Sequence, residues 1–209
     1  MLGELANPPD DATDESVAGL ARAVQFLDPS LSSEAGSFVT RAVLLALMPR
    51  REKAKALVLG VSEEPRKDTA EVSKAIQKLN DALKLIPDFA DAYFRRGMVR
   101  YTSGDVAGAQ KDWEKVVELG QPGPLDFRAL SNGYPASLYN LACVNAVRAR
   151  DTPPGPERSK LLDAAFDHLS KAIEAGRGEV QSMDADPDLA ALRSDSRYKE
   201  LVKGLKPGS

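Results

Sequence analysis

The chain of 209 residues is long enough for one domain or one short repeat array. Its 43% hydrophobic and 28% charged residues are typical of a water-soluble protein with a core, and the low aromatic content of 6% favours packed helices over β-sheets. A net charge of −3 and a pI near 5.4 exclude the general attraction of a basic chain to nucleic acid or anionic lipid. The single cysteine, Cys143, excludes an intrachain disulfide and favours a reducing compartment.

The N-terminal region carries no recognisable targeting signal. It lacks the basic head and apolar run of a secretory peptide. The longest apolar run, Ala42–Met48, is far shorter than the roughly 20 residues that a membrane span needs. We therefore expect a soluble, cytoplasmic protein without direct membrane insertion, and a start processed from a longer precursor stays open. Residues 1–13 are rich in Pro and Asp, which predicts a flexible N-terminus.

From Asp14 onward, apolar residues recur at helical spacing, and no segment shows the sustained alternation of a β-strand. Breakers divide this pattern into helices: Pro49 breaks the chain, Gly60 closes a short helix, and Pro87 ends a longer one that a capping box at Asp68–Glu71 opens. The sequence therefore predicts an all-α fold. The expected helices span 14–27, 33–48, 53–59, 68–86, 90–102, 105–119, 136–149, 157–175, 187–193 and 197–205.

The stretch Asp91–Leu119 reads DAYFRRGMVRYTSGDVAGAQKDWEKVVEL. Two short helices can approach closely only where side chains are small, and large residues then fill the gap to the next pair. Five positions follow this rule, with an aromatic residue, a small residue, a turn glycine, a second small residue and a large residue: Tyr93, Gly97, Gly104, Ala109 and Trp113. In this spacing the stretch resembles the tetratricopeptide repeat (TPR), a helix pair of about 34 residues. It departs from the family at Arg96, where Leu is usual, and at Arg100, where an aromatic is common.

Partial copies flank this repeat. Ser73–Pro87 resembles the second helix of a preceding repeat, whose first helix is expected within 37–48 with an insertion between the two. Ser137–Val147 and Ala164–Gly176 resemble the two helices of a following repeat. Asp186–Leu201 resembles the closing unit of repeat arrays in multidomain bacterial proteins, including some signalling kinases.

The resemblance implies a short right-handed superhelix (α-solenoid) of about three TPR-like helix pairs with extra N- and C-terminal helices. It implies one TPR-like helical domain over 14–205, after the flexible residues 1–13. Within the domain, the expected units are the clearest repeat at 90–122, partial repeats at about 37–87 and 136–176, and capping helices at 187–205.

In TPR arrays the first helices line a concave groove, so the resemblance implies that their exposed face binds a partner. An Arg beside aromatics and a Met would suit an acidic or amphipathic peptide. The alternative is that neighbouring or terminal helices bury Phe94 and Met98 and that Arg95 is solvated. The groove candidates are Asp91, Phe94, Arg95, Met98, Tyr101, Tyr139 and Asn140, joined in the last unit by Cys143 and Val147 and, more weakly, in the first by Thr40 and Val43.

Some family members clamp the C-terminal carboxylate of chaperone tails with Lys, Asn and Arg on this groove. Here Val39, Val43 and Asp91 stand at positions where the clamp needs polar or basic residues, so only Arg95 and Asn140 are of suitable type. The sequence therefore disfavours chaperone-tail binding.

Few residues point to chemistry. The lone His168 has no Cys nearby in sequence, which disfavours a metal site or a catalytic dyad, and Cys143 is expected to be a small core residue. The alternating Asp184, Asp186 and Asp188 lack the Gly and terminal Glu of a calcium loop, so helix capping before Leu189 is expected. A basic cluster at 50–55 has no interleaved aromatics and is expected to be solvated. We therefore predict no catalytic residue, metal or cofactor.

The favoured function is a protein-interaction module, an adaptor or scaffold that binds a peptide or protein on the concave face of the TPR helices. A structural cap or oligomerisation domain of a larger signalling or assembly protein is the alternative, and a homo-oligomer stays open. An enzyme or small-molecule sensor with an interhelical pocket ranks third, because it would need titratable groups converging on the groove. No nucleic-acid partner is expected.

Overall fold

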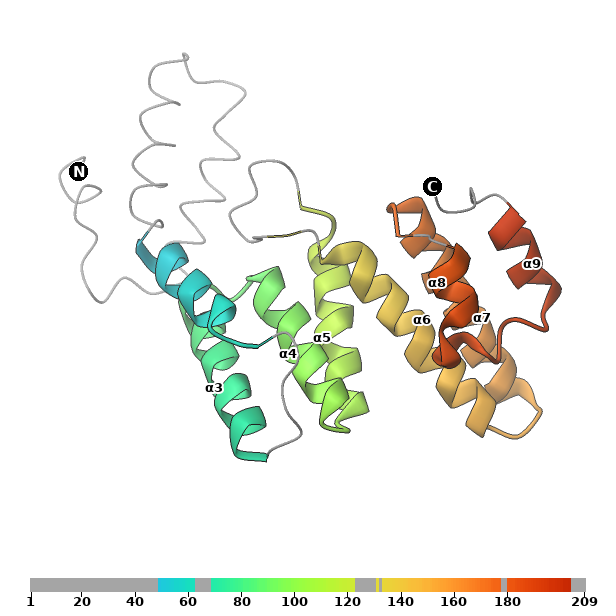
Figure 1. The fold of residues 1–209 in the computed structure, drawn as a ribbon, viewed down its shortest axis with the longest axis horizontal. Coiled ribbons are helices and arrows are strands. Elements are labelled where there is room, and N and C mark those ends of the chain that lie inside the picture. The colour runs from blue at the N-terminus through green and yellow to red at the C-terminus, as the bar shows by residue number, and fades with distance from the viewer. Residues whose placement is uncertain (1–48, 63–68, 123–130, 132, 178–179, 204–209) are drawn as a thin grey trace, which may run out of the picture.

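The computed structural model describes residues 49–62, 69–122, 131, 133–177 and 180–203 (Figure 1). This described part is all-α, which confirms the predicted fold class: it contains helices and one 3-10 turn, and no strand. Residues 49–59 form a first helical segment. The later elements are α3 (Thr69–Leu85), α4 (Ala90–Thr102), α5 (Val106–Leu119), α6 (Tyr134–Asp151), α7 (Pro156–Glu174), α8 (Val180–Ala185), η1 (Pro187–Leu189) and α9 (Ser196–Lys203).

Helices α3, α4, α5 and α6 follow one another in chain order, and α7, α8 and α9 gather at the C-terminal end (Figure 1). Each of α3 to α6 packs against the helix that follows it, while η1 lies on α6 and α9 lies on α7. Contacts between successive helices are typical of a repeat array. The right-handed superhelix stays a prediction. None of the described helices has the length and apolar character that crossing a membrane would require.

Most predicted helices are found near their expected bounds. The helix expected over 90–102 is α4 itself, and α6 begins two residues before and ends two residues after the expected 136–149. The helix expected over 53–59 extends further towards the N-terminus, because residues 49–59 are helical and the fixed φ of proline, about −65°, suits the first turn of a helix. The break predicted at Pro49 stays a prediction, because the residues before it lie outside the described part. The helices expected over 14–27 and 33–48, the flexible residues 1–13, and the positions of Val39, Thr40, Val43 and Asp68 lie outside the described residues.

The C-terminal region differs from the prediction. The helix expected over 187–193 is only the single turn η1, followed by further turns, and α8 was not foreseen. Asp186 caps η1, since its side chain accepts a hydrogen bond from the backbone N–H of Asp188 at 2.9 Å. Two residues of this segment, Leu189 and Leu192, are fully buried. Tertiary packing therefore holds a segment whose own helical preference is weak.

Trp113 of α5 lies directly against Gly97 of α4. A Cβ atom added at Gly97 would lie 2.5 Å from Trp113 Nε1, so only glycine allows this approach. Trp113 is 1% exposed and shares a core cluster with Leu141 and Val144 of α6. The indole therefore joins α4, α5 and α6 in one contact.

The turn between α4 and α5 is built by glycine and aspartate. Gly104 has a φ of 91°, which side-chain-bearing residues rarely adopt. Asp105 then caps α5, accepting a hydrogen bond from the N–H of Gly108 at 2.9 Å.

The two arginines that depart from the repeat pattern bind one buried carboxylate. Asp112 of α5, whose side chain is 3% exposed, accepts from Arg96 Nη2 at 2.6 Å and from Arg100 Nη1 at 2.7 Å. Arg96 Nη1 also donates to Asn80 Oδ1 of α3 at 2.6 Å. An ionic network therefore links α3, α4 and α5 where the family usually has apolar contacts.

We predict that Gly97→Ala destabilises the protein. Helix propensity alone would favour Ala by about 1 kcal/mol, but overpacking against a buried indole costs about 1–3 kcal/mol. The added Cβ would lie 2.5–2.9 Å from three indole atoms, which places the cost at the upper end, so we expect a net loss of about 2 kcal/mol in urea unfolding. In a Trp113→Phe background the same change should cost less, because the smaller ring leaves room for the methyl group. Equal unfolding midpoints for Gly97→Ala and wild type would contradict the close contact.

We predict that Asp112→Asn lowers the free energy of unfolding by about 3 kcal/mol, the lower end for breaking a buried pair, because Arg96 and Arg100 keep part of their exposure. The control is Asp81→Asn, which breaks an exposed pair with Lys84 and should change stability little. Thermal and urea unfolding measure both variants. A similar small effect for the two would show that the Asp112 network contributes no more than a surface pair.

Candidate partner-binding face

Three side chains of α4 form one stripe along the helix. Phe94, Met98 and Tyr101 follow each other at spacings of four and three residues, which places them on the same side. All three are half-buried against the cluster of Ala109, Trp113, Leu141 and Val144. Tyr101 packs against Trp113 with ring centroids 5.6 Å apart. The stripe therefore has a packed base and a partly exposed edge.

Helix α6 continues this surface. Asn140 is half-buried and its Nδ2 donates to Met98 Sδ at 3.4 Å, a weak bond that joins the two helices. Tyr139, 8% exposed, follows on the side towards η1. We call the surface formed by Phe94, Met98, Tyr101, Tyr139 and Asn140 the α4–α6 face. Arg95 lies three residues before Met98 on α4 and therefore borders this face.

The other sequence candidates lie as follows. Asp91 is 5% exposed, and its Oδ1 accepts from the Ser131 hydroxyl at 2.7 Å, so it anchors the segment that precedes α6. Arg95 and Val147 are half-buried, and Cys143 is buried. The structure thus brings candidates of α4 and α6 together at the contact between Asn140 and Met98, although both helices also pack on α5, and it turns Asp91 inward. A role of any of them in binding a partner stays a prediction.

The C-terminal segment borders the α4–α6 face through tyrosine–carboxylate hydrogen bonds. Tyr101 Oη donates to Asp188 Oδ2 at 2.9 Å, and Tyr139 Oη donates to Asp186 Oδ2 at 2.8 Å. Sequence reasoning assigned Asp186 and Asp188 to capping alone and missed these contacts. The available signal was the alternation of Asp in DADPD, which offers a carboxylate at every second position.

The tyrosine and cysteine side chains beside Asp186 and Asp188 have raised pKa values and therefore keep their protons at neutral pH. Burial raises the pKa of Tyr101 and of Tyr139, and the hydrogen bonds to Asp188 and Asp186 raise it further. Burial, followed by the charges of Asp186 and Asp188, also raises the pKa of Cys143. Cys143 is therefore a thiol rather than a thiolate nucleophile at neutral pH.

Cys143, Asp186 and Asp188 have ligand atoms that all lie within 4.8 Å of one another. Such a set of sulfur and oxygen atoms could coordinate zinc. However, Asp186 already accepts from Tyr139, from the N–H of Asp188 and from the Cys143 thiol at 3.8 Å. A metal would have to displace these bonds and ionise a thiol whose pKa is raised.

His168 has a different environment. It is half-buried on α7, and its Nδ1 lies 3.4 Å from Asn145 Nδ2. Burial is the main cause that lowers its pKa, so the ring is neutral at physiological pH. His168 and Cys143 each have another neighbour and give no sign of a catalytic dyad.

Comparisons with known proteins support the repeat resemblance over part of the chain. The sequence is 41% identical over 69 residues, 32% of this chain, to tetratricopeptide repeat protein 36 of Homo sapiens and to that of Mus musculus. It is 30% identical over 73 residues, 35% of this chain, to that of Bos taurus. The chain spans little more than a third of the length of these relatives, 35%, 36% and 39% respectively. No family model and no solved structure matches.

We predict that stability falls as the pH rises through about 10. Unfolded tyrosines ionise near pH 10, whereas burial and the bond to Asp184 raise the pKa of Tyr198 to about 12, and those of Tyr101 and Tyr139 are raised too. The folded state keeps protons that the unfolded state releases, so this stabilisation is complete below about pH 10 and is lost above it.

Urea unfolding below and above about pH 10 measures this effect. The double variant Tyr101→Phe, Tyr139→Phe should show a shallower loss than wild type, while lysine ionisation is common to both proteins. Equal pH dependence in the two proteins would disprove the contribution of these tyrosines.

Proposed function

We propose that this chain is a protein-interaction module, an adaptor or scaffold, that binds a peptide or protein partner on the α4–α6 face. The observation that carries the proposal is the half-buried stripe of Phe94, Met98 and Tyr101 on α4, which Asn140 of α6 contacts at Met98. The similarity to proteins named as tetratricopeptide repeat proteins supports an interaction role in general.

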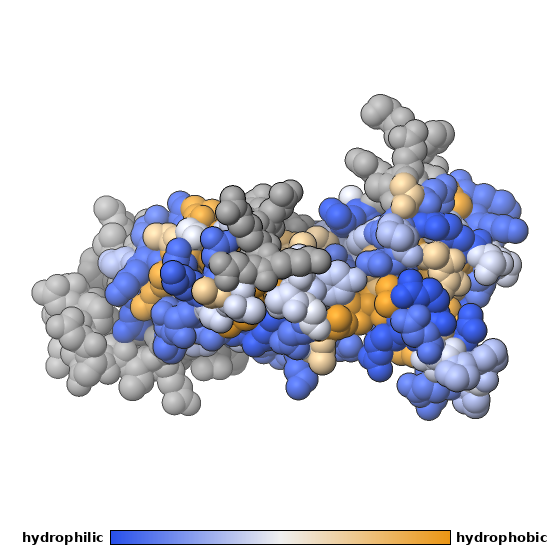
Figure 2. Space-filling model, turned by 60° about the horizontal axis from the view of Figure 1, so that its bottom comes forward, coloured by the Kyte–Doolittle hydropathy of each residue, from blue (hydrophilic) through white to orange (hydrophobic). Residues whose placement is uncertain are grey.

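The chemistry of the face suits recognition of a polypeptide. Aromatic side chains and methionine supply apolar contact area, and methionine adapts to differently shaped partners. The side of the molecule drawn in Figure 2 is mainly hydrophilic, with smaller apolar groups between charged residues. The α4–α6 face itself combines apolar side chains with the amide of Asn140, so the partner is expected to combine apolar anchors with polar contacts. We propose no catalytic role, because Cys143, the buried thiol, has a raised pKa and partners of its own.

We predict that the double variant Arg95→Glu, Asn140→Ala captures its partner from native lysate at least about tenfold less than wild type, since a loss of about 1.4 kcal/mol is tenfold in affinity. The control is Lys111→Glu, a charge reversal at an exposed position of α5. Capture is quantified by mass spectrometry after thermal melting has shown that both variants fold.

Equal capture by the double variant and by Lys111→Glu would reject the α4–α6 face. Light scattering of the same proteins tests the oligomerisation alternative. A mass that rises with concentration in wild type and not in the double variant would identify a second copy of the chain as the partner.

A further inference from the structure

We propose that the α4–α6 face takes a peptide segment with a Lys or Arg side chain, whose cation pairs with Asp188 while an apolar neighbour contacts Phe94 and Met98. This inference rests on the proposed function and adds the chemistry of the partner. The basic segment proposed here differs from the acidic or amphipathic peptide that the sequence analysis expected from Arg95.

The first argument is that Asp186 and Asp188 have only neutral hydrogen-bond donors. Both carboxylates are half-buried, and their donors are two tyrosine hydroxyls, one backbone N–H and one thiol. Within the described residues, neither forms an ion pair. The buried carboxylate of Asp112, by contrast, forms ion pairs with two arginines.

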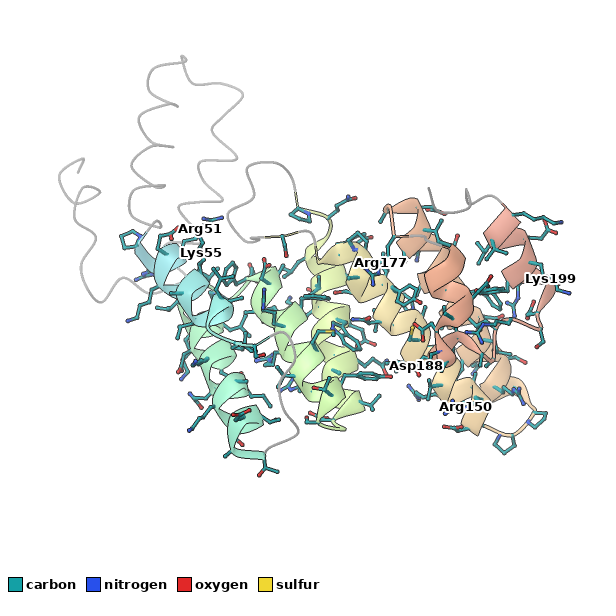
Figure 3. All side chains as sticks on the ribbon, viewed as in Figure 1. Arg51, Lys55, Arg150, Arg177, Asp188 and Lys199 are labelled. Carbon is teal, nitrogen blue, oxygen red and sulfur yellow. The ribbon has the colours of Figure 1, made fainter. Side chains whose placement is uncertain are left out.

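The second argument is that the nearby cations are held elsewhere. Figure 3 shows Arg177 and Arg150 towards opposite ends of α6, with Asp188 between them. The Arg177 guanidinium lies 5.2 Å from the centre of the Tyr139 ring, and Arg150 Nε pairs with Asp151 at 2.9 Å. The Arg193 guanidinium donates to the backbone carbonyls of Asp186 and Met183, and not to a carboxylate. In the described part of the chain, the carboxylates of Asp186 and Asp188 therefore lie close together without an ion pair. Their effect is visible in the pKa of Cys143, which both carboxylates raise.

The third argument is geometric. Asp188 is bound to Tyr101, the last member of the α4 stripe, so the charge lies at one end of an apolar row. Phe94 and Tyr101 are seven residues apart, which is about 10 Å along a helix and about three residues of extended peptide. The aliphatic stem of a Lys or Arg can lie on Tyr101 while its charged end reaches the carboxylate. We therefore expect an apolar residue about three positions from the basic one.

A peptide cation fits this place better than a divalent metal. Asp186 already accepts three hydrogen bonds, and the thiol of Cys143 would have to ionise. By contrast, Asp188 accepts one side-chain hydrogen bond, at Oδ2, and keeps partial exposure, so a basic side chain can approach without displacing Tyr101.

The test selects phage-displayed random dodecapeptides on the purified full chain and measures the affinity of the selected peptides by fluorescence anisotropy. The variants are Asp188→Asn, which keeps an acceptor for Tyr101 and removes the charge, and the matched control Asp184→Asn. Asp184 is an exposed carboxylate of the same segment that accepts from Tyr198. Thermal melting confirms that both variants fold.

We expect selected peptides enriched in Lys or Arg with an apolar residue about three positions away. Asp188→Asn should weaken their binding about tenfold, as for loss of a charged hydrogen bond, and Asp184→Asn should not. Added salt should weaken binding to wild type more than to Asp188→Asn.

Other outcomes overturn the inference in distinguishable ways. One such outcome is the selection of peptides that are not enriched in Lys or Arg and that bind Asp188→Asn as tightly as wild type. If these peptides lose affinity for the double variant Arg95→Glu, Asn140→Ala, the basic partner is rejected and the proposed function stands. If no peptide binds this face, the proposed function fails and the inference fails with it. Tight binding of Zn²⁺ alone in calorimetry, abolished by Cys143→Ser, would reject the peptide cation in favour of a metal.

Discussion

The close contact between Gly97 and Trp113 is the constraint on which the rest of the described structure depends. It lets α4 and α5 approach until the indole touches the α4 backbone, and the far side of the indole then receives α6 through Leu141 and Val144. The same indole supports the Tyr101 ring, which belongs to the partly exposed stripe. One buried side chain thus sets the spacing of three helices and positions the α4–α6 face.

Two kinds of contact stabilise the carboxylates of Asp112, Asp186 and Asp188, ion pairs with arginine and hydrogen bonds from tyrosine. Arg96 and Arg100 form ion pairs with Asp112, so the negative charge of this carboxylate is compensated between α4 and α5. Asp186 and Asp188 are stabilised by tyrosine hydroxyls, which satisfy hydrogen bonding without cancelling charge. The first arrangement fixes geometry, whereas the second leaves a negative potential beside the surface that we propose for binding.

The C-terminal segment is part of the core as well as a border of the face. Met183, Leu189, Leu192 and Tyr198 are buried against the α6–α7 pair, so Asp186 and Asp188 are carried on a fixed support. A polar site is most useful for recognition when its groups are preorganised, because binding then costs less ordering entropy. The relatives match about a third of the chain.

The sequence by itself determined the helices of the central region and the small and large residues of the clearest repeat, because periodicity, glycine and proline act over a few neighbouring residues. It misjudged the segment after Gly176, where packing outweighs weak local preference. Only the tertiary structure decided what the polar residues do. Arg96 looked like a departure until Asp112 faced it from another helix, and Tyr101 reaches Asp188 across 87 positions of sequence. The packing of the helices decides which side chains a carboxylate can bind, and a local sequence pattern does not predict that packing.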